Sequence, residues 1–178
     1  MADNNPTVVL EANALYICLT QLMSDGFHWA LFITDAQGKA TRHHWSQDQR
    51  RREQSDPYEV YTHARIDPVT EITKGLNMNL AFIKVSAFVA PPAPYDYVSL
   101  FSTVFPETYT TLRGNRTHGT TCRTWAMRAL QKLREQGLIT LNDQAVVALE
   151  QRFKDIGTAA EAEIAAGGRA GHTKVTRV

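Results

Sequence analysis

Hydrophobic residues in the first half of the chain occur in short runs separated by turn-forming residues, which is the pattern of β-strands. The segment FHWALFIT is the clearest run, and Asp35–Gly38 (DAQG) after it predicts a hairpin turn into the next strand. Five runs predict strands, over residues 13–22, 27–34, 39–45, 58–66 and 80–89.

The second half changes to helical spacing, and its clearest element lies between Gly119 and Gly137. The apolar face of this predicted helix is formed by Cys122, Trp125, Ala129 and Leu133. Thr120 or Thr121 is the expected N-cap, because a hydroxyl can accept one of the free amide protons of the first turn. Gly137 is the expected stop.

Two further helices are predicted, over residues 95–104 after a group of prolines and from an Asn142 cap to Gly157. Residues 108–121 read as a polar loop. The stretch 158–178, rich in alanine and glycine, is expected to be a disordered tail. Strands followed by helices predict one α+β domain over residues 1–157, with a mostly antiparallel sheet packed against the Cys122 helix.

Composition narrows the possible partners. The chain has 178 residues and a formal net charge of +1, so no basic field favours nucleic acid. No apolar run approaches the roughly 20 residues of a membrane span. The first residues, MADNNPTVVL, lack the basic start of a signal peptide. Two cysteines, Cys18 and Cys122, are too few for a disulfide framework. A cytoplasmic protein is expected.

Cys122 is the leading candidate for chemistry. A thiol at a helix N-terminus lies at the positive end of the helix dipole, which favours the nucleophilic thiolate. The alternative is a structural cysteine, since free cysteine is often buried. A nucleophile also needs a nearby imidazole and a polar group that orients it. His28 begins a predicted strand, and His43 and His44 lie on the next one, facing opposite sides.

The strand segment Phe27–Ile33 (FHWALFI), then His44, then Cys122-Arg123-Thr124-Trp125 at a helix start resemble the circularly permuted NlpC/P60 branch of the papain-like superfamily. This branch includes the lecithin retinol acyltransferase group. The chain is also similar to a family of small fungal proteins with a histidine-tryptophan strand and a Gly-Cys-Arg-x-Trp helix. The resemblance covers approximately residues 10–157.

The resemblance implies a role for each matching residue. Cys122 would be the nucleophile, His28 the general base and later acid, and His44 the group that orients His28. His43 takes the orienting role instead if the strand register differs by one residue. Four residues near these positions are candidates for substrate binding: Trp29, His118, Arg123 and Trp125.

The expected function is that of a thiol-dependent hydrolase or acyltransferase, without a cofactor, acting on an ester, thioester or amide. A cyclase would use the same groups, and fungal secondary metabolism is the setting that the resemblance implies. The alternative is a binding or scaffold protein that retains the fold. A zinc site formed by His28, His44 and Cys122 is a third possibility, although no local ligand spacing supports it.

Overall fold

The sheet is the frame of the molecule. The computed structural model describes residues 8–22, 26–47, 58–67, 79–167 and 173–178, which form a six-stranded mixed sheet and four helices. The strands are β1 (Leu15–Gln21), β2 (Phe27–Thr34), β3 (Ala40–Gln47), β4 (Glu59–Ile66), β5 (Asn79–Lys84) and β6 (Lys174–Arg177). Their order is β4-β3-β2-β1-β5-β6. All pairs are antiparallel except β5–β6, and the predicted α+β class is confirmed.

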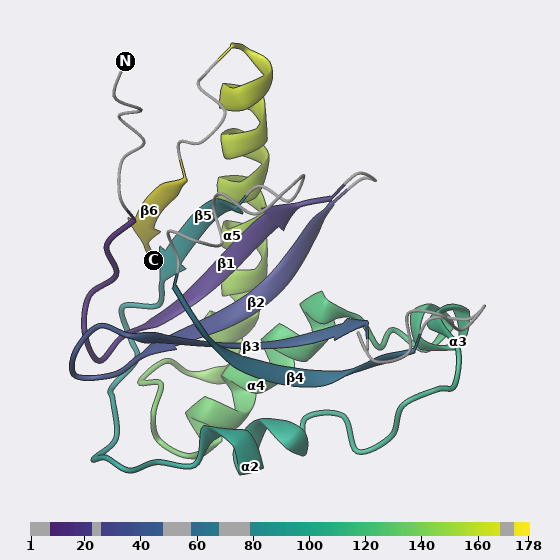
Figure 1. The fold of residues 1–178 in the computed structure, drawn as a ribbon, viewed down its shortest axis with the longest axis horizontal. Helices are drawn as coiled ribbons and strands as arrows, with labels where there is room; N and C mark the ends of the chain where they lie inside the picture. Colours follow the sequence, from purple (N-terminus) through teal and green to yellow (C-terminus); the bar gives the residue numbers. More distant parts are fainter. Residues whose placement is uncertain (1–7, 23–25, 48–57, 68–78, 168–172) are drawn as a thin grey trace.

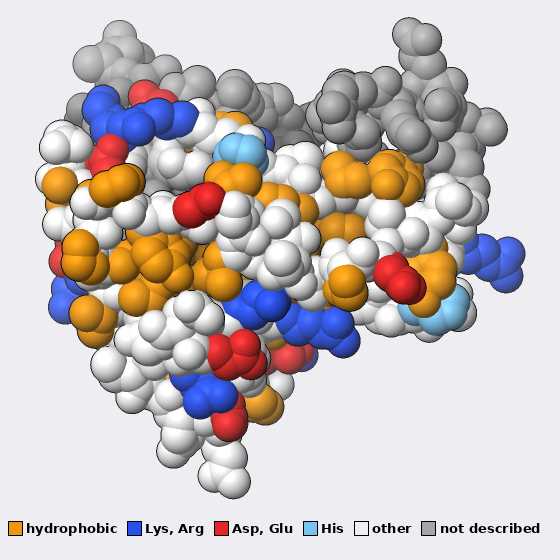
Figure 2. Space-filling view, turned by 90° about the horizontal axis from the view of Figure 1, so that it is seen from below, with side chains coloured by type: hydrophobic (Ala, Val, Ile, Leu, Met, Phe, Trp, Pro, Cys, Tyr) orange, Lys and Arg blue, Asp and Glu red, His pale blue; other side chains and the backbone are white. Residues whose placement is uncertain are grey.

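The helices are α2 (Tyr97–Ser102), α3 (Leu112–Thr117), α4 (Cys122–Glu135) and α5 (Asp143–Ala165). Figure 1 shows α4 and α5 on the same face of the sheet, with α2 below β4. Figure 2 views the molecule from the side of α2, where hydrophobic side chains gather over part of the described surface. Among the described residues, no helix has the length and apolar character needed to cross a membrane.

The alternation of side chains along β2 separates two hydrophobic clusters. Trp29 and Leu31 pack in the large core beneath the helices, where Trp125 of α4 is fully buried. Ala30 and Phe32 belong to a smaller cluster on the other face. Because side chains alternate along a strand, His28 shares the face of Ala30 and Phe32, as its position in the sequence predicts.

Helix α4 begins where the sequence predicts. Thr121 is the N-cap, with its hydroxyl accepting from the N–H of Thr124, while the Thr124 hydroxyl accepts from the N–H of Thr121. This reciprocal capping box places Cys122 as the first residue of the helix. The buried face of α4 is formed by Trp125, Ala126, Ala129, Leu130 and Leu133.

Helix α5 extends beyond the predicted stop at Gly157 and ends at Ala165. A Cβ atom at Gly157 would lie 2.8 Å from side-chain atoms of Leu19 and Phe27, so this glycine allows the helix to approach the sheet closely. It therefore serves packing rather than termination. The tail that the sequence predicts to be disordered is structured in its described part, which completes α5 and adds β6 to the sheet.

Two other boundaries differ from the prediction. Strand β5 ends at Lys84 because the chain turns there, with the N–H of Phe88 donating to the carbonyl of Val85. The expected loop over 108–121 contains α3, whose first turn is capped by the Thr111 hydroxyl accepting from the N–H of Gly114. Local capping, rather than hydrophobic periodicity, stabilises so short a helix.

Candidate functional site

Two histidines meet where β2 and β3 separate. The two strands pair only from Leu31, opposite His43, to Thr34, opposite Ala40. Beyond this ladder the Nε2 of His28 lies 2.7 Å from the Nδ1 of His44, and their rings meet edge to face. The sheet thus brings together the predicted base and the residue predicted to orient it.

His44 is held in turn by hydroxyl groups. Its Nε2 lies 3.4 Å from the Oγ of Ser46, which is 3.1 Å from the hydroxyl of Thr62 on β4. His44 and Thr62 are opposite each other in the β3–β4 ladder. Both ring nitrogens of His44 therefore have partners, which fixes the orientation of its ring relative to His28.

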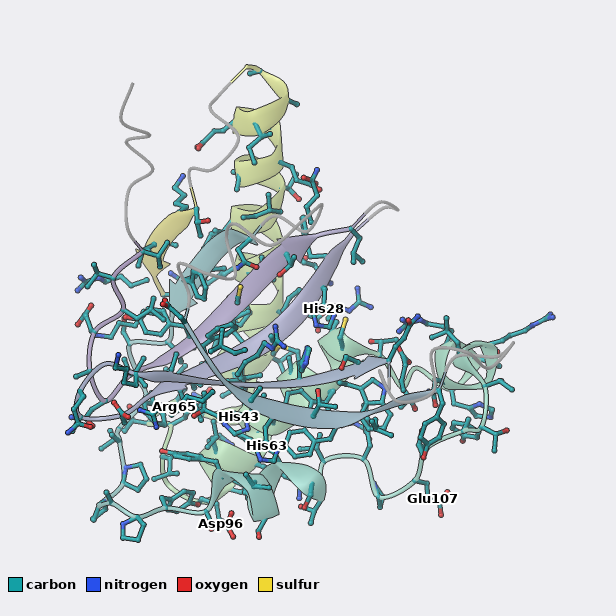
Figure 3. All side chains as sticks on the ribbon, in the orientation of Figure 1. His28, His43, His63, Arg65, Asp96 and Glu107 are labelled. Atoms are coloured by element: carbon teal, nitrogen blue, oxygen red, sulfur yellow. The ribbon has the colours of Figure 1, made fainter. Side chains whose placement is uncertain are left out.

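His43 occupies a different environment, although it is the next residue along β3. It points to the face that carries the helices, where its Nδ1 lies 2.8 Å from the Tyr61 hydroxyl. Figure 3 shows His43 beside His63, apart from His28. Of the two neighbours on β3, the structure brings His44, not His43, to His28.

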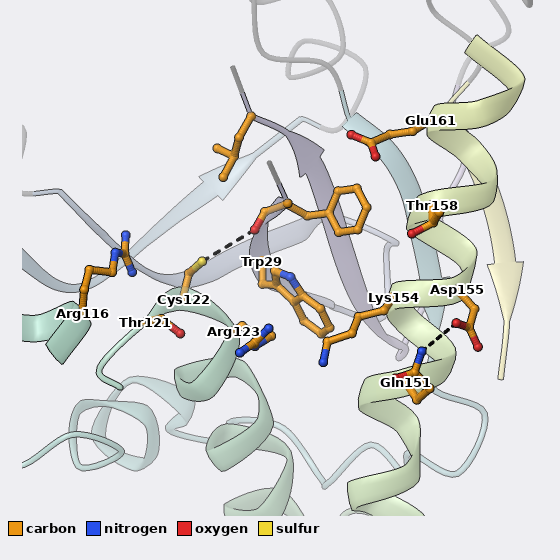
Figure 4. A pocket seen from close by; sticks show the side chains of 13 residues that line it. Trp29, Arg116, Thr121, Cys122, Arg123, Gln151, Lys154, Asp155, Thr158 and Glu161 are labelled. Atoms are coloured by element: carbon orange, nitrogen blue, oxygen red, sulfur yellow. Dashed lines mark hydrogen bonds between the residues drawn. The ribbon is translucent and has the colours of Figure 1, made fainter. Parts of the chain in front are cut away.

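The thiol of Cys122 approaches β2 from the start of α4. Its Sγ donates a hydrogen bond to the carbonyl oxygen of Phe27 over 3.9 Å (Figure 4). This oxygen belongs to the peptide bond that joins Phe27 to His28. Within the described residues, the thiol has no hydrogen bond to the ring of His28, and the Nδ1 of His28 has no hydrogen-bond partner. The thiol therefore lies beside the backbone at His28 without contacting the imidazole.

The histidines at this end of the sheet are neutral near physiological pH. Burial lowers the pKa of His28 to about 4, and the positive charges of Arg42 and Arg116 add to this effect. Burial also lowers the pKa of His44 to about 2, with smaller contributions from His28 and Arg42. A neutral imidazole can accept a proton, but a pKa of about 4 makes His28 a weaker base than an ordinary histidine.

The thiol is also neutral. Burial raises the pKa of Cys122, and this outweighs the opposing influence of the Trp29 N–H and of Arg116. The helix position alone predicts the opposite direction, a thiolate. Desolvation exceeds the effect of the helix terminus because the thiol is largely enclosed by α4 and β2. The resting pair is thus a thiol and an imidazole, not a thiolate and an imidazolium.

A cavity of about 780 Å³ opens beside the thiol. It lies between the start of β2, the start of α4 and the second half of α5, as Figure 4 shows. Its apolar walls include Phe27 and Trp29. Its charged groups are Arg116, Arg123, Lys154, Asp155 and Glu161. Cys122 is half-buried and is one of the residues that line this space.

Arg116 is a site residue that the sequence showed only as part of a basic stretch. Its guanidinium lies 2.9 Å from the carboxylate of Glu59, whose side chain is 5% exposed, and it also lines the cavity. The buried Asn115 donates to the same carboxylate over 3.3 Å. Glu59 and Arg116 are 57 residues apart. Since no local pattern connects them, the sequence could not select Arg116 over Arg113.

The four residues predicted to bind substrate take different positions. Trp29 and Arg123 line the cavity, and Arg123 also lies 3.5 Å from Glu150 of α5. Trp125 is fully buried in the core and does not line it. His118 stacks on Tyr109 at 3.9 Å between ring centroids, and its Nδ1–H donates to the carbonyl of Gly114, away from the cavity lining.

The described residues contain no group of three or more His, Cys, Asp or Glu side chains arranged as metal ligands. Comparisons of the chain with models of known families, with curated proteins and with solved structures find no match.

Proposed function

We propose that the protein is a thiol-dependent hydrolase or acyltransferase in which Cys122 is the nucleophile, His28 the general base and His44 the orienting residue. The hydrogen bond of 2.7 Å between His28 and His44, together with the cavity that Cys122 lines at the neighbouring start of α4, is the observation that carries this proposal. Such a chain of thiol, imidazole and polar partner is typical of papain-like acyl transfer. The permuted papain-like fold belongs to the same proposal.

The reaction begins from neutral groups. The Nδ1 of His28 takes the thiol proton as Sγ attacks the carbonyl carbon of an ester, thioester or amide. The proton then passes to the leaving group, and an acyl-enzyme remains on Cys122. Water or a second nucleophile, again deprotonated by His28, attacks this intermediate and releases the product and the free thiol. An internal nucleophile in the substrate would give a cyclic product.

One feature of α4 supports this assignment. The Thr121 hydroxyl caps the N–H of Thr124, so the N–H of Cys122 remains available to an oxyanion at the helix N-terminus. The thiol lies at the peptide bond preceding His28, but the imidazole shares the face of Ala30 and Phe32, away from α4, so proton transfer requires the ring to turn toward the thiol. Catalytic hydrogen bonds are often longer in the free enzyme than in the substrate complex.

The raised pKa of the thiol and its hydrogen bond to the Phe27 carbonyl favour a second candidate. In that case the cavity binds a polar small molecule without covalent chemistry, and Cys122 is one of its walls. This protein would bind its ligand with equal affinity after Cys122→Ala, and its thiol would show no dependence on His28.

Intact-mass spectrometry on a Cys18→Ala background tests the proposal. The probes are p-nitrophenyl acetate and an acetyl thioester of N-acetylcysteamine. We expect an acetyl group on Cys122, mapped by peptide digestion, and its slow release into water. Cys122→Ala should remove both. Release of acetyl to an added amine or alcohol would identify an acyltransferase.

Absence of the adduct with both probes, or an adduct that forms equally fast in the wild type and in His28→Ala, would exclude a Cys–His catalytic pair. The binding protein would then be the better assignment. Cys18 is 1% exposed, so its replacement by alanine removes a background thiol without changing the accessible surface.

A further inference from the structure

A second cavity, of about 320 Å³, lies at the opposite end of the β2–β3 ladder. It lies between the end of β2 at Ile33 and Thr34, His43 of β3 and residues 90–98, which lead into α2. It shares no lining residue with the cavity at Cys122. Its volume is at the lower end of the range of about 300–1,000 Å³ that is typical of small-molecule sites.

The walls of this cavity are apolar and aromatic. Tyr95 and Tyr97 lie with their ring centroids 4.7 Å apart, and both line it together with Ile33, Pro91 and Val98. Tyr97 also stacks on Phe101, which closes the core behind it. Aromatic side chains bury large areas of a flat ligand with little loss of conformational entropy.

His43 supplies a buried polar group in this apolar setting. Its side chain is 2% exposed and lines the cavity, and its Nδ1 is paired with the Tyr61 hydroxyl. Its Nε2 takes part in none of the hydrogen bonds between described residues and is not one of their buried atoms without a partner, so it keeps some accessible surface beside the cavity that the ring lines. An accessible N–H on an otherwise buried ring can donate to a ligand.

The Tyr61 hydroxyl determines which ring nitrogen of His43 carries the proton. Burial raises the pKa of Tyr61, so the phenol keeps its proton. A phenol is the better donor and an imidazole nitrogen the better acceptor, so the hydroxyl donates to Nδ1. The neutral ring then carries its own proton on Nε2, which presents an N–H donor to the cavity.

The charged groups at the rim already have partners. Arg65 lies 2.6 Å from Asp35, and the carboxylate of Asp96 keeps its charge while accepting from the N–H and the hydroxyl of Ser99. The uncharged donors among the lining residues include the phenols of the two tyrosines and the N–H of His43. Of these, His43 is the most buried, which makes it the donor in the least polar surroundings.

We propose that this cavity binds a flat, uncharged aromatic molecule of about two fused rings that carries one hydrogen-bond acceptor, such as a carbonyl oxygen. The rings lie between the tyrosines and the apolar walls, and the acceptor bonds to Nε2 of His43. This site is separate from the proposed acyl-transfer site and does not depend on it.

Ligand-observed NMR with two probes of similar shape tests the proposal on the full chain. Coumarin is flat and carries a carbonyl oxygen, and naphthalene lacks an acceptor. We expect coumarin to bind about tenfold more tightly than naphthalene, the usual effect of one buried hydrogen bond. His43→Phe should remove this preference by weakening coumarin alone. His63→Phe is the matched control, because His63 stacks on His43 but does not line the cavity.

Val98→Trp provides an independent variant if His43→Phe does not fold. Val98 is 38% exposed at the rim, so the larger side chain can fill the cavity without entering the core. We expect it to weaken both probes at least tenfold, whereas Cys122→Ala should leave both unchanged. Equal affinity for the two probes in the wild type, or binding that Val98→Trp does not weaken, would overturn the proposal.

Discussion

His43 and His44 are neighbours on β3, yet they belong to different regions of the molecule. His44 lies at the separated end of the β2–β3 pair, where hydroxyl groups fix its ring against His28. His43 lies on the other face, among aromatic rings, with the Tyr61 hydroxyl as its partner. Burial lowers the pKa of both.

This comparison shows that a residue type and its burial do not define a role. Both rings are neutral bases in enclosed surroundings, and only the groups opposite them differ. His44 faces a second imidazole on the side of the sheet away from the helices, and His43 lies among aromatic rings beside a small, mostly apolar cavity. The face of the strand therefore determines which chemistry each histidine can support.

The largest expected effect is at His28. We predict that His28→Ala lowers the rate of Cys122 acylation by p-nitrophenyl acetate about 10²- to 10⁴-fold, because the variant lacks the proposed general base. His63→Ala is the control and should retain the wild-type rate, since His63 is exposed and lies away from the cavity. If His28→Ala is acylated at the wild-type rate, then the His28–His44 pair has no role in the reaction.

His44 and His43 can be compared directly in the same assay. We predict that His44→Ala lowers the acylation rate about 10- to 100-fold, because the ring of His28 loses its orienting partner. His43→Phe should change the rate less than about twofold if it remains folded. Circular dichroism of both variants separates misfolding from loss of orientation. Equal losses in the two variants would show that neither face is specific to the reaction.

His43 should make the folded protein less stable in acid. Its folded pKa is lowered from 6.5 to about 3, so below pH 6.5 the unfolded chain takes up a proton that the folded chain refuses. Stability therefore falls as the pH falls, by about 2 kcal/mol between about pH 7.5 and about pH 5 for this residue alone. Above about pH 7.5 the ring is neutral in both states and contributes no pH dependence.

Urea unfolding at about pH 7.5 and about pH 5 measures this loss. In His43→Phe the difference between the two free energies of unfolding should be smaller than in the wild type by about 2 kcal/mol. The variant will be less stable at both pH values because it lacks the bond to Tyr61, so the comparison rests on the difference. An unchanged difference would show that His43 titrates normally in the folded chain.

The smallest effect concerns the packing that holds the thiol end of β2. Gly157→Ala would place a methyl group against Leu19 and Phe27, and Phe27 bonds to the Cys122 thiol. Overpacking costs about 1–3 kcal/mol and the gain in helix propensity returns about 1 kcal/mol, so we expect a net loss of about 1 kcal/mol. Thermal unfolding measures it, with the exposed Thr158→Ala as control. A more stable Gly157→Ala protein would contradict the close approach of α5.

Much of the fold follows from local patterns. The hairpin at Asp35–Gly38 and the Asn142 cap are found where the sequence predicts them. The Thr121 cap confirms one of the two predicted alternatives. The extension of α5 past Gly157 could not be predicted, because the reason for that glycine is a contact with residues far along the chain. The pairing of β6 with β5 joins segments about ninety residues apart and has no local signal.

For the site, the sequence by itself determined the candidate groups: a cysteine at a helix start, a histidine on a strand and two adjacent histidines on the next strand. The tertiary structure decided which of those two faces His28, brought Arg116 to the cavity, and separated His118 and Trp125 from it. It also reversed the expected direction of the Cys122 pKa. The physical reason is that capping and periodicity act over a few residues, whereas strand register, desolvation and cavity shape arise only when distant segments pack together.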